Sequence, residues 1–195
     1  MKESDRLAVE GESPRGRLLR EAAHLFREKG FERTTVRDIA AAVGIQSGSI
    51  FHHFRSKEDI LYYIMTDTIE EITARMEAEL ARSSDPVERL RSLIFCELQA
   101  VNGQTSEAMA VLVYEWRSLA KERQEQVLKL RDYYEHLWLS VLQECAAAGQ
   151  IAADPGILRR FLAGALSWTV TWYRTDGSAS LEDLASQALT LAVKQ

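Results

Sequence analysis

The chain has 195 residues, 46% of them hydrophobic and only three of them prolines, so it can bury a sizeable core of little-interrupted helices. No run of about 18 apolar residues occurs, which argues against a membrane span. The net charge of −5 argues against nucleic-acid binding, but the charge is unevenly distributed: residues 1–57 hold 11 Lys and Arg against 8 Asp and Glu, whereas residues 58–195 hold 13 against 21. A phosphate-binding surface is therefore expected only at the N-terminal end.

The N-terminal segment and the two cysteines indicate where the protein works. Residues 1–13 are polar and charged, so the sequence predicts a disordered segment there and no secretory signal. Cys96 and Cys145 lie in apolar helical stretches without C-x-x-C spacing, which is typical of reduced, buried thiols. We therefore expect a cytoplasmic protein without a membrane partner, a metal site or a cofactor.

Residues 14–57 predict a small domain of three short helices, after which a long fourth helix begins. The helix starts are marked by capping side chains or by proline at the first position, and the ends by glycine. These signals are, in chain order, Ser13-Pro14 and Gly30, then Thr35 with Asp38 and Gly44, then Ser47 for a third helix over 48–54, then Ser56 with Asp59.

The remaining sequence, 58–195, keeps apolar residues at helical spacing to its end. No stretch of alternating polar and apolar residues rich in β-branched side chains competes, so the predicted fold class is all-α. The expected helices span 57–80, 87–102, 108–119, 124–148, 155–174 and 181–192.

Residues 34–57 read TTVRDIAAAVGIQSGSIFHHFRSK and predict a helix-turn-helix. Two short helices joined by V-G-I-Q-S-G have the geometry by which a second helix enters the major groove of DNA. Ile50 and Phe54 face the core at i and i+4, whereas the outward positions carry no acidic charge that phosphates would repel. Those outward positions are Ser47, Gly48, Ser49, His52 and His53.

The adjacent histidines His52 and His53 also suggest a metal site. Side chains at i and i+1 of a helix diverge by about 100°, so they do not converge on one ion. We therefore predict no metal site here.

This stretch resembles the helix-turn-helix of the TetR family of transcriptional regulators. The matching residues are Thr34-Thr35-Val36-Arg37-Asp38-Ile39-Ala40, Gly44-Ile45, Ser47-Gly48-Ser49-Ile50-Phe51, His53-Phe54 and Ser56-Lys57-Glu58. The resemblance implies that DNA is contacted by Arg37, Ser47, Gly48, Ser49, Phe51, His52, His53 and Lys57, with His53 and Lys57 meeting phosphates. Phe51 stands where the family usually has tyrosine, so one hydroxyl contact to a phosphate is missing.

The last two predicted helices indicate a dimer. The stretch ILRRFLAGALSWTVTWYR is apolar nearly all the way round and needs cover on several faces, which two helices from each of two subunits would supply as a four-helix bundle. The TetR resemblance implies the same pairing; completion of a monomer core is the alternative. The expected interface residues are Phe161, Ala165, Trp172, Leu181, Leu184 and Ala188.

The helices between these ends are expected to surround a small effector. Its expected lining is Phe95, Met109, Tyr114, Trp116, Arg117, Tyr134, Trp138 and Trp168, for each of which ordinary core packing is the alternative. Arg117 and Arg131 either pair with Glu115 and Asp132 or meet an anionic ligand. The motifs VYEWRSLA, RDYYE and WTVTWYR resemble the TetR subgroup that regulates fatty-acid and sterol breakdown, which implies an acyl-CoA ligand.

These features predict a helix-turn-helix domain over 14–57 and a ligand-binding and dimerisation domain over 58–195. The expected function is a repressor that binds a palindromic double-stranded DNA operator as a homodimer and is released by an amphipathic ligand. An all-α enzyme is the first alternative, but no nucleophile–base pair or phosphate loop is visible, and acidic pairs such as Glu58-Asp59 are expected on solvated faces. A helical interaction module without DNA binding is the second.

Overall fold

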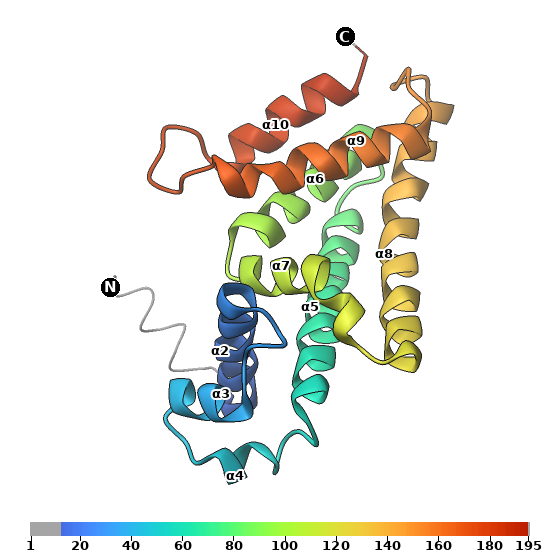
Figure 1. Ribbon diagram of the computed structural model, residues 1–195. Helices are drawn as coiled ribbons and strands as arrows, with labels where there is room; N and C mark the ends of the chain where they lie inside the picture. The colour runs from blue at the N-terminus through green and yellow to red at the C-terminus, as the bar shows by residue number, and fades with distance from the viewer. Residues whose placement is uncertain (1–12, 195) are drawn as a thin grey trace.

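The computed structural model describes residues 13–194, so most of the segment predicted to be disordered, 1–12, lies outside the described residues, as does Gln195. Every regular element of the described part is a helix, which confirms the all-α prediction (Figure 1). None of these helices combines the length and apolar character needed to cross a membrane.

The N-terminal head consists of α2 (Pro14–Lys29), α3 (Val36–Val43) and α4 (Ser47–Ile50), at the bottom left of Figure 1. The predicted local signals are in place: Ser13 Oγ accepts from Gly16 N at 3.0 Å, and Thr35 and Asp38 form a reciprocal capping box. Gly44 ends α3 with φ of 77°, a left-handed conformation that glycine adopts without steric cost. The head therefore follows from cap chemistry that is local in sequence.

The recognition segment is shorter than predicted. The structure has helix only over Ser47–Ile50, and Ser47 is its first residue, not its side-chain cap. Hydrogen bonds from Phe51 N to Gly48 O and from His53 N to Ile50 O tighten the chain into a turn. This turn brings Phe54 back into the core, where only 1% of it is exposed.

Six further helices follow in the described part of the chain, and α5 lies at their centre, in contact with α2, α6, α7 and α8. They are α5 (Lys57–Leu80), α6 (Pro86–Asn102), α7 (Ser106–Tyr114), α8 (Lys121–Ala147), α9 (Pro155–Trp168) and α10 (Leu181–Ala192). Two predicted helices are interrupted by short 3₁₀ segments, Trp116–Ser118 and Thr169–Thr171. At the second break the Thr169 hydroxyl donates to Leu166 O at 2.6 Å, a local bond that competes with helix continuation.

The core has two parts joined along α5. The lower part combines the head with the first half of α5, with α7 and with Val127 near the start of α8. The upper part combines the second half of α5 with α6, α8, α9 and α10, and it contains both buried cysteines. Met109 and Tyr134 pack against both parts, so they lie where the two cores meet.

Candidate nucleic-acid interface and effector site

The outer face of α4 and its following turn is fixed from behind by apolar anchors. Ile50 and Phe54 are each 1% exposed, as the i, i+4 spacing predicts. Phe51, by contrast, is 56% exposed, and both His52 and His53 are exposed beside it. The predicted contact residues Arg37 and Gly48 are exposed too, while Ser47 and Ser49 are half-buried. All seven thus lie in α3, in α4 or in the turn after it, and residues 47–54, which make up α4 and this turn, contain no acidic residue.

Lys57 has a structural role that the sequence did not indicate. Its ammonium donates to Phe31 O at 2.7 Å and lies 4.1 Å from the centre of the Phe31 ring. These contacts hold the start of α5 against the turn between α2 and α3. Lys57 is therefore already engaged within the head, and a phosphate contact would use only its remaining donors.

Arg55 is a candidate DNA contact that the sequence analysis missed. It is exposed between the buried Phe54 and the capping Ser56, at the end of the recognition turn. Residues 14–57 hold nine lysines and arginines against four aspartates and glutamates, so this part of the head is more basic than residues 1–57 taken together. The signal for Arg55 was the R-S-K triplet that precedes the long helix.

Glu58 and Asp59 were predicted to lie on a solvated face, but Asp59 is buried and Glu58 is half-buried. Asp59 is 8% exposed, and its carboxylate accepts from Arg55 N at 2.9 Å and from the guanidinium of Arg123 on α8. Glu58 Oε1 accepts from Ala120 N at 2.8 Å. Burial disfavours the charge on Asp59, but the bonds from Arg55 N and Arg123 outweigh it and lower the pKa of this carboxyl.

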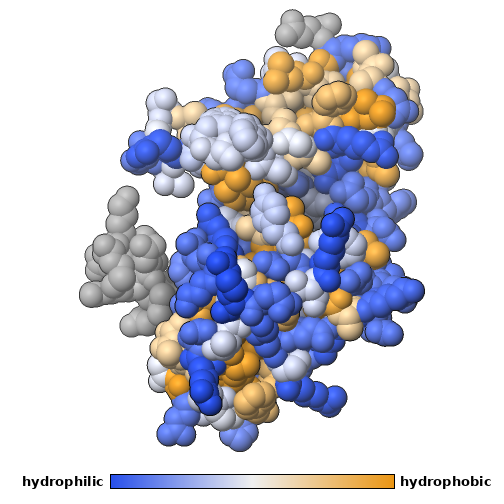
Figure 2. Space-filling model, in the orientation of Figure 1, coloured by the Kyte–Doolittle hydropathy of each residue, from blue (hydrophilic) through white to orange (hydrophobic). Residues whose placement is uncertain are grey.

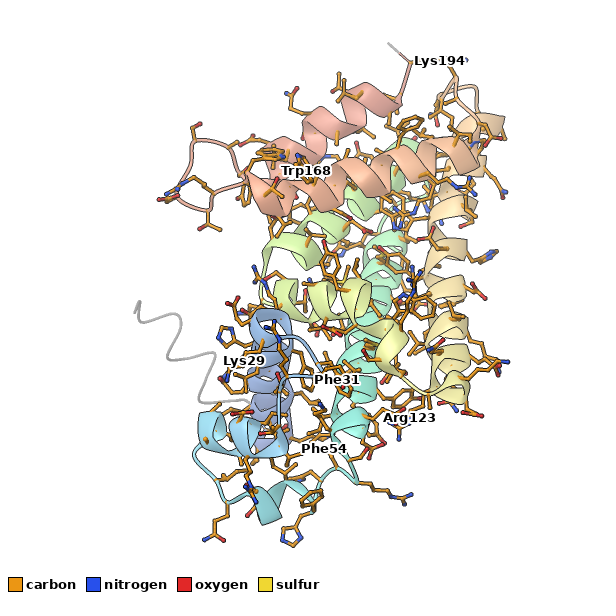
Figure 3. The ribbon with its side chains drawn as sticks, in the orientation of Figure 1. Lys29, Phe31, Phe54, Arg123, Trp168 and Lys194 are labelled. Carbon is orange, nitrogen blue, oxygen red and sulfur yellow. The ribbon has the colours of Figure 1, made fainter. Side chains whose placement is uncertain are left out.

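These contacts form a clamp, here called the Arg123 clamp, of Glu58, Asp59, Ala120 and Arg123. The guanidinium of Arg123 also lies 4.9 Å from the centre of the Tyr62 ring, so it covers the first turns of α5 (Figure 3). The clamp joins the start of α8 to the start of α5, directly after the recognition turn.

A second set of bonds joins α7 to the head. Glu107 accepts from His24 at 2.9 Å, and this bond raises the pKa of His24. Glu115 Oε1 accepts from Phe31 N at 3.2 Å. This carboxylate therefore bonds to the head, whereas one of the two alternatives had it pair with Arg117. Arg117 and Arg131 are both exposed, which removes them from the interior of the helical domain.

The predicted effector residues divide into two groups. Trp138 is fully buried, and Phe95, Met109 and Tyr134 pack half-buried against the same upper core. The second group lies outside: Tyr114 is 79% and Trp168 66% exposed, Arg117 is exposed and Trp116 half-buried. The first group is therefore the candidate inner wall of an effector site. Near the head, a cleft of about 610 Å³ between α2, α5 and the start of α7 contains none of these residues.

An unexpected polar cluster lies beside that inner wall. Arg159 of α9 is 4% exposed and donates to both carboxylate oxygens of Glu135, at 2.9 and 2.8 Å. Glu97 of α6 is equally buried and accepts from the Tyr134 hydroxyl. Burial raises the pKa of Glu97, although Arg159 opposes the shift. Only Tyr134 of these four was among the predicted site residues.

The outer side of α9 carries an apolar stripe. Its large members are 48–73% exposed within one chain and recur at intervals of three to four residues: Ile157, Phe161, Trp168 and Trp172, with the small Ala165 between them. Figure 2 shows orange and tan side chains gathered over the upper part of the molecule, where α9 and α10 lie. The predicted α10 residues differ, because Leu181, Leu184 and Ala188 pack against the chain's own core, whereas Leu191 is 89% exposed.

Two family models match this architecture. Residues 18–64 match "Bacterial regulatory proteins, tetR family", and residues 83–195 match "Tetracyclin repressor-like, C-terminal domain". The chain belongs to the TetR family. Its TetR-type helix-turn-helix is α3 and α4, and its TetR-type C-terminal domain takes in α6 to α10.

Individual TetR relatives agree over nearly the whole chain. The transcriptional repressor KstR2 of Rhodococcus jostii is 34% identical over 182 residues, 92% of this chain and 89% of KstR2. The structure of the ketosteroid transcriptional regulator KstR2 of Mycobacterium tuberculosis has a TM-score of 0.83 at 29% identity, covering 94% and 97% of the two chains. The crystal structure of the superantigen PfiT has a TM-score of 0.78 at 61% identity, covering 94% and 98%. This chain is accordingly a helix-turn-helix transcriptional regulator similar to the KstR2 repressors.

Proposed function

We propose that this TetR-family regulator binds a palindromic operator as a homodimer and is released from it by a small amphipathic molecule. The observation that carries the proposal is the recognition surface. Ile50 and Phe54 anchor α4 and its turn, while Ser49, His52 and His53 face outward without a competing carboxylate. Such a surface suits a major groove lined by phosphates.

The dimer is supported by the stripe on α9. Three large apolar side chains of α9 and Trp172 just after it are half to three-quarters exposed, and such exposed apolar surface marks association sites. A twofold pairing through α9 and the outer side of α10 places two heads on one side of the molecule. Two short recognition helices then read half-sites about 34–36 Å apart, which makes up for the few contacts of each.

The effector is proposed to be an acyl-CoA or a related thioester with a long apolar part. The inner wall of Phe95, Met109, Tyr134 and Trp138 is an apolar part of the upper core, and Met109 and Tyr134 extend it to the lower core. Two sets of contacts connect the helical domain with the region of the head: the Arg123 clamp next to the recognition turn, and the bond from Phe31 N to Glu115. A coupling of about 1–3 kcal/mol between the two sites suffices for a 5–150-fold change in operator affinity.

Fluorescence anisotropy with DNA from the region upstream of the protein's own gene tests the operator contact. We expect the double variant Ser49→Ala, His52→Ala to bind at least tenfold more weakly. The matched control is Gln143→Ala, His136→Ala on the exposed side of α8, far from α4, and it should bind as the unsubstituted chain does. Equal affinity of the two double variants would refute the named contact set.

The salt dependence of binding separates DNA recognition from a protein-interaction role. If phosphates are contacted, the operator affinity falls steeply as the salt concentration rises. A thermal-shift panel of acyl-CoAs, free fatty acids and cationic drugs then tests the effector class. Stabilisation by cationic drugs alone would contradict the acyl-CoA assignment.

The 61% identity with the superantigen PfiT supports a second candidate function, stimulation of T cells by this chain. Purified protein free of endotoxin, added to human T cells with antigen-presenting cells, tests it by proliferation. The double variant Ser49→Ala, His52→Ala is the control, because its loss of DNA binding should leave a protein-recognition activity unchanged. Absence of proliferation at micromolar protein would refute this candidate and leave the repressor role untouched.

A further inference from the structure

The cleft of about 610 Å³ lies where the head meets the helical domain, between α2, α5 and the start of α7. These three helices lie side by side, and each of them contacts the other two (Figure 1). The apolar part of the lining comes from all three: Leu19, Ala23, Ile64 and Ala108. None of the residues expected around the effector belongs to this cleft, so it is a separate cavity that borders the head directly.

One side of α5 faces the cleft with residues spaced by three and four positions: Ile64, Asp67, Thr68 and Glu71. Thr68 is only 6% exposed, yet its hydroxyl makes no hydrogen bond within residues 13–194. Buried hydroxyls are normally hydrogen-bonded, and the described part of the chain supplies no partner for this one. The partner therefore has to come from the contents of the cleft.

The two carboxylates beside Thr68 each keep one oxygen without a donor. Asp67 accepts from Arg15 through Oδ2, and Glu71 accepts from Arg75 through Oε1, both at 2.7 Å. In the part of the chain that the structure describes, no group donates to Asp67 Oδ1 or to Glu71 Oε2. Together with Thr68 Oγ1, α5 thus presents three acceptors within little more than one helical turn.

The arginines around the cleft are engaged in ion pairs. Besides the two that bond to the carboxylates of α5, Arg20 of the lining lies 3.5 Å from Glu21. Arg27 lies 3.5 Å from Glu107, the third carboxylate of the lining. An anion would have to break one of these pairs to reach a guanidinium, whereas a cation with N–H donors meets acceptors that have no partner.

We propose that this cleft binds a primary ammonium group that carries an apolar chain, as in a lipophilic amine. The three N–H donors of such a group match the three acceptors of α5, and its chain covers the apolar part of the lining. The site differs from the effector site in place and in the charge that it accepts. The inference therefore goes beyond the proposed function and does not rest on an acyl-CoA effector.

Isothermal titration calorimetry on the full-length protein tests the ligand class with four probes that share one eight-carbon chain. They are octylammonium, octyltrimethylammonium, 1-octanol and octanoate, which separate charge from hydrogen-bond donors. We expect octylammonium to bind at least tenfold more tightly than octyltrimethylammonium, which has the charge but no N–H. Equal affinities of these two cations would overturn the inference.

Variants assign the binding to the cleft. Thr68→Val and Glu71→Gln should each bind octylammonium about three- to tenfold more weakly, the value of one hydrogen bond. The matched controls, Thr73→Val and Glu70→Gln, are on the same helix but outside the lining. Thr73 is also buried with an unpartnered hydroxyl, so it reproduces every property of Thr68 except access to the cleft.

An equal loss of octylammonium affinity in a variant and in its control would place the amine elsewhere and overturn the inference. If Thr68→Val does not fold, Glu71→Gln carries the test, because it changes an exposed carboxylate. Release of operator DNA by acyl-CoA is measured on the same proteins. Failure of that release would refute the effector part of the proposed function, whereas binding of octylammonium with the expected variant pattern keeps the amine site.

Discussion

At the scale of single residues, the missing hydroxyl of Phe51 removes one expected contact between the head and a DNA phosphate. The exposed Phe51 ring ends at a carbon where the TetR resemblance implies a phenolic hydroxyl. Phe51→Tyr adds one donor to the surface expected to face phosphates. We predict a two- to tenfold gain in operator affinity, the value of about one hydrogen bond, measured by anisotropy at fixed salt. Tyr133→Phe is the control for the removal of a surface hydroxyl elsewhere, and unchanged affinity in Phe51→Tyr would place this ring away from the DNA.

Asp59 makes stability depend on pH. Its pKa lies below the ordinary 3.8 despite burial, since Arg55 N and Arg123 favour the charged form. A lowered folded-state pKa stabilises the fold above the unfolded-state pKa, and this contribution is lost as the pH falls through the folded value. We therefore predict that Asp59→Asn lowers the melting temperature at pH 7 and brings it closer to the unsubstituted chain as the pH falls below 4. Calorimetry between pH 7 and pH 3 measures this, and a constant difference would contradict it.

At the scale of helices, α9 leaves three large apolar side chains exposed within one chain. Phe161, 73% exposed, lies at the centre of the stripe between Ile157 and Trp168. A charge at this position in a dimer interface would be buried without a partner. Phe161→Arg is therefore expected to yield monomers in sedimentation velocity and to lose operator binding. Arg160→Glu, exposed on the same helix, is the control; a Phe161→Arg dimer of unchanged affinity would exclude this face.

Helix ends were predictable where their determinants are local. Ser13, Thr35 and Ser180 cap helices within three residues of themselves, so the sequence shows both partners at once. The 3₁₀ break at 116–118 was not predicted, because the neighbouring Glu115 bonds to Phe31 across 84 positions of the chain. At 169–171, a bond from Asn102 across 67 positions adds to the local bond of Thr169, and only the local partner can be read from the sequence. Periodicity gives the apolar side of a helix, but not the helix that covers it.

The same limit applies to the candidate sites. The outward face of α4 was predictable because Ile50 and Phe54 fix its orientation by spacing alone. Arg159, Glu97 and the Arg123 clamp were missed, because a charged residue in a sequence does not show whether another helix buries it. Tyr114 and Trp168 were wrongly expected to face inward, since aromatic composition does not distinguish a core wall from an exposed patch.

At the scale of the whole molecule, the Arg123 clamp joins the start of α8 to the start of α5, next to the recognition turn. We predict that Arg123→Ala changes operator affinity without ligand only a few-fold, but reduces the release caused by the effector at least fivefold. The reason is that movement of α8 is no longer passed to the start of α5. Anisotropy titrations with and without acyl-CoA measure both quantities. Arg131→Ala, exposed on the same helix, should release normally; full release by Arg123→Ala would show that coupling runs through α7 instead.

Because α5 is one continuous helix, a small rotation at its upper end produces a larger displacement at its lower end. Its 24 residues form one unbroken helix from the recognition turn to the upper core, a rod of about 36 Å. A rotation of about 5° around the upper end of such a rod displaces the lower end by about 3 Å, close to the rise of one base pair (about 3.4 Å) along each DNA strand. In a dimer the two displacements are related by the twofold axis, so a rearrangement of a few ångströms around a ligand is enough to take both heads out of register with the double helix.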